Sequence, residues 1–281
     1  MNNPYLPIPM IIKRITNETT AKDIKTFELA FLNKEDEKIF SYLPGQFAEI
    51  SVLGAGEAPI GIASSPTEKG ILKFTVKWYE KGVVTNALHN LFTGDEVGIR
   101  GPFGNSFQSK NIIGKSVVVI GGGFAFTTLR SLTTYMIHHN NRNKFKNITV
   151  IYGARSPDDL IYKKELEEWA ERDDVKLYVT VDKGDKGWKG REGFVPTVVG
   201  EVAPSAQGAV AIICGPPVMI KFTIPKLVEL GFSPENILNS LEMRMKCGIG
   251  KCGRCNIGNK YVCKDGPIFS LAELNDLPKE Y

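Results

Sequence analysis

Cysteine is scarce in this chain. Only five of its 281 residues are cysteines, and four of these fall within residues 245–263, MKCGIGKCGRCNIGNKYVC. Small disulfide scaffolds are cysteine-rich throughout and belong to oxidising compartments. The chain begins with MNNPYLPIPMII, where no basic segment precedes an apolar one, so no secretory signal is visible. The sequence therefore predicts a cytoplasmic protein that works under reducing conditions.

Long apolar runs, strong net charge, internal repeats and low-complexity segments are missing as well. The longest apolar stretches, residues 117–120 and 209–214, are strand-sized, whereas a membrane span needs about 18 residues. A formal net charge of +4 without an obvious basic stripe argues against nucleic acid. It is compatible with dinucleotide phosphates or an acidic electron-transfer partner. The remaining class is a globular protein, long enough for two domains and a small third lobe.

Residues 1–112 have the pattern of an antiparallel β domain. Alternating or β-branched runs recur between turn signals, as in IKTFELAF, FAEISVL and LKFTVKWY. Several short strands at this spacing predict a barrel or a sandwich. Residues 33–36, NKED, are expected to form a turn, and residues 84–91 are expected to form a helix.

Residues 113–230 instead alternate between strands and helices, which predicts a parallel, doubly wound sheet. The strands are KSVVVIGGG, NITVIYGAR, KLYVTVD and AVAIICGPP. Helices are expected over residues 127–138, over 156–172 with Ser156 as N-cap and Pro157 at the first position, and over 219–231. Residues 231–281 carry the cysteines and a polar tail. In that tail, Ser270 and Glu273 fit a capping box.

The four clustered cysteines, Cys247, Cys252, Cys255 and Cys263, have the spacing C-x4-C-x2-C-x7-C. Two disulfides would need an oxidising compartment, and a zinc ribbon would usually offer two C-x2-C-like pairs. The order C-x4-C-x2-C with a distal cysteine is the plant-type 2Fe–2S spacing. Nearby glycines let the backbone wrap tightly and aim N–H groups at sulfur. The spacing therefore favours a 2Fe–2S cluster over zinc, and zinc over disulfides.

A glycine turn follows the first strand of the α/β segment. Gly121, Gly122 and Gly123 open the stretch GGGFAF. Glycine at such a turn lets the backbone approach a pyrophosphate at a helix N-terminus. The stretch is not a regular G-x-G-x-x-G, so a tight strand-to-helix turn without a ligand remains the alternative.

Taken in order, the motifs of the whole chain resemble those of the ferredoxin–NADP reductase superfamily. The terminal cysteines narrow the resemblance to the branch that holds the gamma subunits of sulfhydrogenases, the B subunit of anaerobic sulfite reductase and the electron-transfer subunit of dihydroorotate dehydrogenase. The resemblance implies a flavin-binding β-barrel (1–112), an NAD(P)-binding α/β domain (113–230) and a 2Fe–2S lobe (231–281). The motifs that carry it are PGQF (44–47), APIGIASSP (58–66), GVVT (82–85), GDEVGIRGPFGN (94–105), VIGGGFAFTTLRSL (119–132), YGAR (152–155), CGPPVMIKFT (214–223) and MKCGIGKCGRCNIG (245–258).

The resemblance also implies which residues hold FAD. Ala58 stands where the family usually has an arginine that contacts the flavin pyrophosphate, and Gly61 stands where it has a hydroxyl residue near flavin N5. Lys77 is expected to supply the missing positive charge, and Thr85 to offer its hydroxyl and helix N-terminal amides to phosphate. The expected FAD residues are Ala58, Pro59, Ile60, Gly61, Val76, Lys77, Gly82, Val84 and Thr85.

For NAD(P), the implied residues are Gly121, Gly122, Gly123, Arg155, Gly215 and Pro216. Ala125 and Thr128 depart from the glycine and proline common in the family. Arg155 is suited to a ribose 2′-phosphate but equally to Asp158 or Asp159, so NADH and NADPH both stay open. Cys214, the fifth cysteine, is expected to pack near the nicotinamide rather than to act as a nucleophile.

These expectations combine into one function. The chain is predicted to be an NAD(P)H-dependent oxidoreductase subunit that passes electrons between NAD(P)H, FAD and a 2Fe–2S cluster. Its expected partners are other subunits of a redox complex, such as a hydrogenase, a sulfite reductase or a heterodisulfide-type reductase. Two alternatives are a stand-alone reductase of ferredoxin and a non-catalytic assembly protein held together by zinc.

Overall fold

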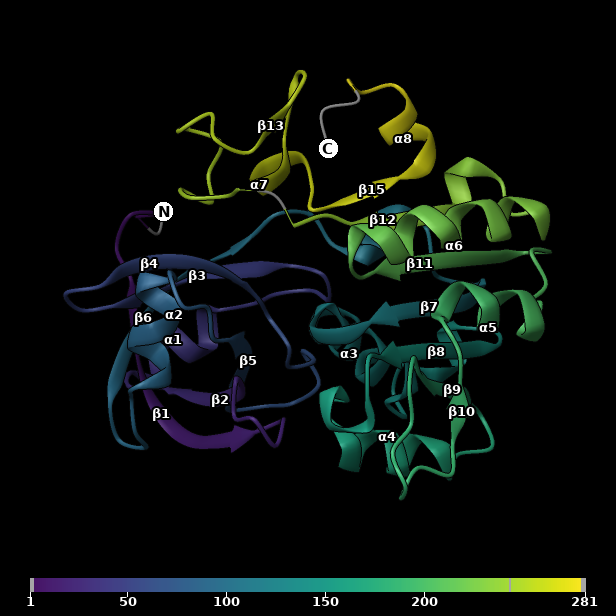
Figure 1. The fold of residues 1–281 in the computed structure, drawn as a ribbon. Helices are drawn as coiled ribbons and strands as arrows, with labels where there is room; N and C mark the ends of the chain where they lie inside the picture. The colour runs from purple at the N-terminus through teal and green to yellow at the C-terminus, as the bar shows by residue number, and fades with distance from the viewer. Residues whose placement is uncertain (1–2, 243, 279–281) are drawn as a thin grey trace.

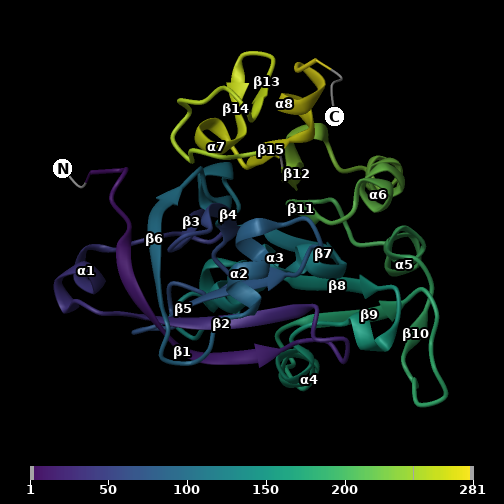
Figure 2. The same cartoon turned by 60° about the vertical axis from the view of Figure 1, so that its left-hand side comes forward.

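The computed structural model describes residues 3–242 and 244–278. It has three parts, which Figure 1 shows as a barrel on the left, an α/β sheet on the right and a small lobe above both. Figure 2 shows the same lobe resting over the junction of the other two parts. None of the described helices is long and apolar enough to cross a membrane.

The barrel is a six-stranded antiparallel sheet in the order β4-β3-β6-β1-β2-β5. A bridge between Ile62 and Phe74 connects the two ends of this order and closes the sheet. Closure encloses a core that includes Met10, Phe27 and Ile50, against which Ile60 of β4 packs while partly buried. The strands are β1 (Ile8–Asn17), β2 (Ile24–Phe31), β3 (Phe47–Val52), β4 (Gly56–Gly61), β5 (Leu72–Lys77) and β6 (Glu96–Phe103).

Two short helices accompany the barrel. The predicted helix at residues 84–91 is present as α2 (Val83–His89). The predicted turn at residues 33–36 is wrong, because Asn33 begins helix α1 (Lys34–Ile39). The Asn33 side chain accepts a hydrogen bond from the Glu35 amide, and acidic residues fill the first turn, where they suit the helix dipole.

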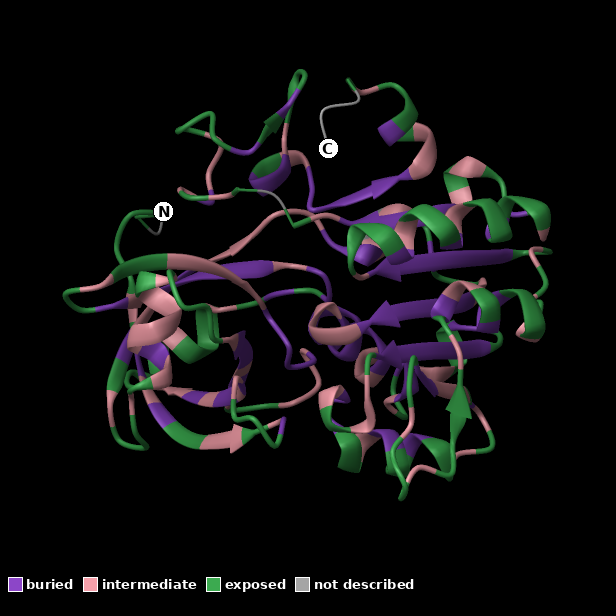
Figure 3. Cartoon of the chain, viewed as in Figure 1, coloured by how far each residue is buried: buried purple, intermediate pink, exposed green. Residues whose placement is uncertain are grey.

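The α/β sheet has seven strands in the order β10-β9-β8-β7-β11-β12-β15, and all neighbours are parallel except β12 and β15. Figure 3 shows that its central strands are buried between helices. Along β7, Val117 and Val119 face the α3 side while Val118 and Ile120 face the α5 and α6 side. The strands are β7 (Ser116–Gly122), β8 (Ile148–Ala154), β9 (Lys176–Val181), β10 (Arg191–Glu192), β11 (Ala209–Cys214), β12 (Ile237–Ser240) and β15 (Ile268–Ser270).

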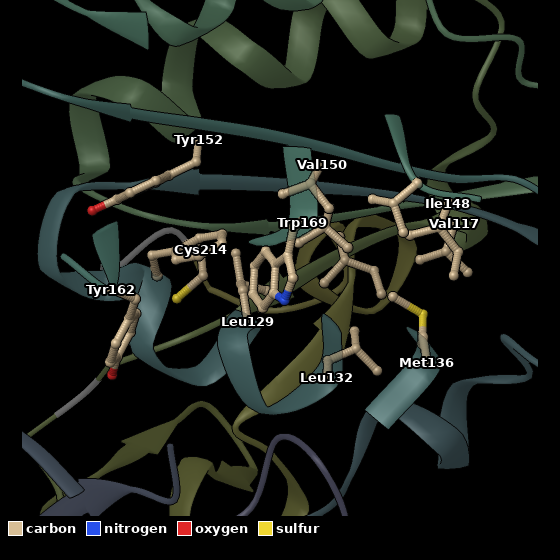
Figure 4. Close-up of a cluster of buried hydrophobic side chains, with 14 of the residues drawn as sticks. Val117, Leu129, Leu132, Met136, Ile148, Val150, Tyr152, Tyr162, Trp169 and Cys214 are labelled. Carbon is tan, nitrogen blue, oxygen red and sulfur yellow. The ribbon is translucent and has the colours of Figure 1, made fainter. Parts of the chain in front are cut away.

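The helices of this part are α3 (Phe126–Ile137), α4 (Lys163–Ala170), α5 (Val195–Val202) and α6 (Pro217–Glu229), which contains Pro225. Figure 4 shows the side chains that α3 and α4 bury against the sheet, among them Leu129 and Trp169. The 3-10 helices of the chain are Phe107–Lys110, Gly123–Ala125, Arg142–Lys144, Pro157–Asp159 and Pro234–Asn236.

The single helix predicted over residues 156–172 is wrong. Ser156 and Pro157 begin only the 3-10 turn Pro157–Asp159, and α4 starts at Lys163. Leu160, Ile161 and Tyr162 lie between them, and all three are buried. The chain between the 3-10 turn and α4 is therefore packed into the core as extended or turn backbone, and Tyr162, the N-cap of α4, has a left-handed φ of +57.

The C-terminal lobe is built around the cysteines. It contains the hairpin β13 (Asn256–Ile257) and β14 (Lys260–Tyr261) and helix α7 (Val262–Asp265). The chain then returns to the α/β sheet as β15 and ends in α8 (Leu271–Asn275). The predicted capping box of Ser270 and Glu273 is confirmed at the start of α8.

Candidate functional site

A cavity of 270 Å³ lies where the three parts meet. The barrel contributes β4, the end of β5 and the start of α2. The α/β part contributes the N-terminal turn of α3. The segment that leads into the cysteine lobe closes the remaining side. The lining residues are Gly45, Phe47, Ala58, Pro59, Ile60, Gly61, Thr75, Val76, Lys77, Tyr79, Thr85, Phe124, Thr127, Thr128, Ser240, Leu241, Glu242, Met245 and Pro267.

Most of the residues expected to hold FAD line this cavity. Ala58, Pro59, Ile60, Gly61, Val76, Lys77 and Thr85 form the barrel wall. The other two do not line it. Gly82 is the N-cap of α2, where its carbonyl accepts a hydrogen bond from the Thr85 hydroxyl, and Val84 packs against the barrel core.

Gly61 of the barrel lies directly against Thr128 of the α/β part. A Cβ atom on Gly61 would lie 2.9 Å from the Cγ2 atom of Thr128, which is closer than carbon atoms approach without strain. The two positions that depart from the resembled pattern therefore lie against each other in the structure. The missing side chain on the barrel makes room for the methyl group on α3.

Several other residues line the cavity besides those expected to hold FAD. Thr127 and Thr128 follow the glycine turn directly, and Tyr79 follows the strand that carries Lys77. Glu242 stands at the opening, where desolvation by the surrounding protein raises its pKa although its side chain still reaches solvent. Tyr79 lies close enough to Glu242 that its own pKa is raised, first by burial and then by that carboxylate. The part of the cavity wall formed by Tyr79 and Glu242 is therefore polar.

The glycines expected to hold NAD(P) lie at the carboxyl edge of the sheet. Gly122 ends β7, and Gly215 follows β11, the neighbouring strand. A Cβ on Gly122 would meet the Met219 side chain at 2.4 Å, and one on Gly215 would meet it at 2.3 Å. Gly123, with φ +54, starts the turn into α3. The Met219 side chain therefore packs onto both strand ends only because both residues are glycine.

Arg155 is exposed just beyond the end of β8. Its alternative partners are engaged elsewhere, because Asp158 accepts a hydrogen bond from Thr20 and Asp159 accepts one from Ser156. Within residues 3–242 and 244–278, no carboxylate oxygen lies within 4 Å of Arg155. Its guanidinium group therefore remains open to an anionic ligand.

Cys214 lies behind the cavity wall and does not line it. Its sulfur is 3.7 Å from the Thr128 hydroxyl and 3.8 Å from the Ser240 carbonyl oxygen, and both of those residues do line the cavity. Burial raises the pKa of this thiol to about 12, so it stays protonated. Cys214 is thus suited to packing rather than to nucleophilic chemistry.

The four clustered cysteines have free thiols and lie within one lobe. The Cys247 thiol lies within hydrogen-bonding range of Cys252, and the Cys263 thiol within range of Cys255. No three potential metal-binding side chains converge on one point among the described residues. A mononuclear zinc site needs four convergent ligands, whereas each iron of a 2Fe–2S cluster takes two cysteines. Four cysteines in one lobe match the ligand set of a 2Fe–2S cluster, two for each iron.

Backbone amides already point at the sulfurs. Lys251 N lies 3.3 Å from Cys247 Sγ, and Gly250 N lies 3.2 Å from Cys263 Sγ. Although burial opposes it, amide donors hold the pKa of Cys247 at about 6, which favours the thiolate that binds metal. Gly248, Gly250 and Gly253 have φ between +70 and +73, so the wrapped loop depends on glycine.

Comparison with known proteins divides the chain in the same way. Residues 12–107 match the oxidoreductase FAD-binding domain, residues 119–224 the oxidoreductase NAD-binding domain, and residues 242–275 the iron–sulfur cluster binding domain of dihydroorotate dehydrogenase B. The expected flavin, nicotinamide and iron–sulfur cofactors are confirmed at the level of these domains.

Full-length relatives narrow the family. The chain is 37% identical to sulfhydrogenase 1 subunit gamma of Pyrococcus furiosus, over 99% of this chain and 95% of that protein. It is 34% identical to the probable dihydroorotate dehydrogenase B electron-transfer subunit of the same organism, over 94% and 92%. A chain in the solved structure of an NADH-dependent reduced ferredoxin–NADP oxidoreductase superposes with a TM-score of 0.73 at 26% identity, over 99% and 91%. With its barrel, its doubly wound sheet and its paired cysteines, the chain belongs to the family of sulfhydrogenase gamma subunits and dihydroorotate dehydrogenase B electron-transfer subunits.

Proposed function

We propose that this chain is the nicotinamide-linked electron-transfer subunit of a larger cytoplasmic redox complex. One observation carries the proposal. The cavity is walled by the barrel, the α/β part and the segment into the cysteine lobe, and its wall residue Met245 stands two positions before Cys247. A flavin held there has the nucleotide domain on one side and the cluster loop on the other.

The flavin, when bound, exchanges a hydride with a nicotinamide and single electrons with an iron–sulfur cluster. The cavity residues named above are proposed to hold FAD, with Lys77 and the N-terminal amides of α2 facing its phosphates. Gly122, Gly123, Gly215 and Pro216 are proposed to receive the NAD(P) pyrophosphate, and Arg155 to face the adenosine ribose. Cys214 is proposed to fix the wall on which the nicotinamide rests.

The proposed exit for electrons is the outer face of the lobe. Cys255 and Cys263 are buried, whereas Cys252 is exposed, so this ligand lies at the surface. The lobe segment that contains Cys252 also carries exposed basic residues, and these are Lys246, Lys251, Arg254, Lys260 and Lys264. A partner subunit with an acidic surface around its own redox centre would fit this face.

The test is an anaerobic visible-light titration of the purified protein with NADH and then with NADPH. Bleaching of both flavin and cluster absorption is expected, and the nucleotide that acts at the lower concentration identifies the preferred donor. A coloured protein that neither nucleotide reduces, even with its partner present, would overturn the proposal.

A variant tests the cluster ligands separately. Cys252→Ser is expected to lose most of the iron while it keeps the flavin, because the flavin cavity does not include Cys252. Cys214→Ser is the matched control, since that thiol belongs to neither pair, and it should keep its iron. Unchanged iron in Cys252→Ser would contradict the ligand assignment.

A further inference from the structure

Arg100 of the barrel strand β6 reaches out of the barrel toward the cysteine lobe. Its side chain is only 6% exposed. Nε and Nη2 form a fork on the Glu57 carboxylate at 2.6 to 3.1 Å, which fixes the plane of the guanidinium group. Because this arginine is buried and held in one orientation, it contributes little to solubility and instead places a positive charge at a fixed position.

The fixed guanidinium faces the first ligand of the cluster. Nη1 and Nη2 lie 3.5 and 3.4 Å from the carbonyl oxygen of Cys247, and Nη1 also donates to the Pro4 carbonyl at 2.7 Å. The Cys247 thiolate and Arg100 are close enough to interact electrostatically, and this contributes to the raised pKa of Arg100 after the larger contributions of Glu57 and Glu49. A positive charge is therefore held beside one end of the cluster loop.

The same strand makes a second contact with the loop. The Phe103 ring lies 5.5 Å from the Arg100 guanidinium carbon and packs so closely on Gly248 that a Cβ there would be 2.6 Å from the ring. Phe103 also packs against Phe47, which lines the flavin cavity. The barrel thus holds the loop at Cys247 and Gly248, and Phe103 connects this contact to Phe47 of the cavity wall.

The charges around Arg100 are incompletely balanced by hydrogen bonds. Glu49 of β3 pairs with Arg100 in the strand register and is fully buried. Neither of its carboxylate oxygens has a hydrogen-bond partner among the described residues. Of these two carboxylates, only Glu57 accepts hydrogen bonds from Arg100. Its negative charge offsets part of the positive charge that Arg100 places beside the cluster loop.

We infer that Arg100 is a positioning residue for the Cys247 loop, and that the Arg100–Glu57 pair sets the reduction potential of the cluster. Reduction adds negative charge to a group that is already anionic, so a nearby guanidinium favours the reduced state and a nearby carboxylate opposes it. The two partners of one ion pair must then act on the potential in opposite directions. The inference rests on the cluster proposed above.

The experiment is a redox titration of the whole protein, followed by electron paramagnetic resonance of the reduced cluster, with iron content measured in parallel. Arg100→Gln is expected to shift the potential to a more negative value, and Glu57→Gln to a more positive one. Arg100→Lys keeps the charge but not the fork, and its potential should lie between those of Arg100→Gln and the wild type.

Arg142→Gln is the matched control. Arg142 also binds a carboxylate, Asp174, and main-chain carbonyls, but it follows α3 at the edge of the sheet where the parallel strands begin, away from the lobe. It should leave the potential unchanged. A purely structural role for Arg100 would change iron content or line shape without opposite shifts.

Shifts of the same sign, or none, in variants that retain iron would overturn the inference. If Arg100→Gln does not fold, Glu57→Gln and Arg100→Lys decide, because Glu57 is partly exposed and its substitution is milder. An absent cluster in the wild type would defeat the proposed function instead, so the two failures are distinguishable.

Discussion

Two buried arginines join the barrel to the other parts of the molecule, and they are satisfied in different ways. Arg130 of α3 binds Glu68 of the barrel, Glu165 of α4 and the Ala63 carbonyl, all at 2.6 to 3.1 Å. Arg100 binds Glu57 closely but the Cys247 carbonyl only at 3.4 to 3.5 Å, beside Glu49, whose carboxylate has no partner among the described residues. The first joint is rigid and balanced, whereas the second keeps unbalanced charge next to the cluster.

The difference suggests a division of tasks. The joint at Arg130 holds two large units at a fixed angle around the flavin cavity. It is reinforced by the Tyr162 hydroxyl, which hydrogen-bonds Thr75 of the cavity wall. Arg100 instead places a positive charge beside the Cys247 loop, which is proposed to bind the cluster. We therefore expect Arg130 to contribute mainly to stability and Arg100 to contribute mainly to the reduction potential of the cluster.

The largest effect is expected from Arg130→Met. This change leaves Glu68 and Glu165 without their common partner, and breaking a buried ion pair in this way costs about 3–5 kcal/mol. Urea denaturation should show that loss in the free energy of unfolding, together with weaker flavin retention. Arg172→Met, at a more exposed pair with Asp174, is the control and should cost less than about 1 kcal/mol.

Glu68→Gln should separate charge from packing at the same joint. Burial opposes ionisation of Glu68, yet Arg130 and Lys73 lower its pKa to about 2. Since this lies below the unfolded value near 4.5, the stabilisation is present above about pH 4.5 and is lost as the pH falls toward 2. We expect Glu68→Gln to cost at most about 3 kcal/mol at pH 7 and nothing near pH 2. A cost independent of pH would disprove this account.

Glu49→Gln should show the opposite dependence on pH. Burial raises the pKa of Glu49 to about 7, despite the opposing influence of Arg100. The folded protein therefore holds this proton more tightly than the unfolded chain, and stability falls as the pH rises from about 4.5 to 7. The amide variant should be more stable than the wild type at pH 8, by at most about 3 kcal/mol. Thermal unfolding from pH 5 to 8 measures it, with the exposed Glu96→Gln as control.

The smallest effect concerns the contact between Gly61 and Thr128. Gly61→Ala places a methyl group 2.9 Å from Thr128 Cγ2, and overpacking of this kind costs about 1–2 kcal/mol. Thr128→Ser removes that methyl group, so the double variant should recover most of the loss. A double-mutant cycle of unfolding free energies measures the coupling, and simple additivity would show that the two residues are independent.

Local sequence patterns predicted the parts of the fold that depend on local physics. The strand-and-helix alternation, the capping box and the spacing of the cysteines are all visible in short windows. The pattern at residues 156–172 misled because propensity favours a helix there, while burial of Leu160, Ile161 and Tyr162 against the core overrides it. The NKED segment misled in the opposite sense, because turn residues also begin helices.

The lining of the flavin cavity was predictable only for the part that the barrel contributes. The residues of β4 and β5 that are expected to hold FAD form contiguous motifs, whereas Thr127, Met245 and Pro267 reach the cavity from distant parts of the chain. Nothing local indicates that Arg100 lies beside Cys247, since the two residues are brought together by the docking of the lobe on β6. Contacts between separately folded parts depend on relative placement, which a single sequence does not contain.

The return of β15 to the α/β sheet has a consequence for engineering. Ser240 of β12 and Ile268 of β15 are antiparallel partners, so the whole cysteine lobe leaves and re-enters the sheet at two adjacent points. A two-residue hairpin turn can join such neighbours. Residues 241–267 therefore form one insertion between two neighbouring strands, and this insertion also carries Leu241, Glu242, Met245 and Pro267 of the cavity wall. A chain shortened to this turn would lose the cysteine loop and one side of the cavity together, so the two sites are coupled parts of a single insertion.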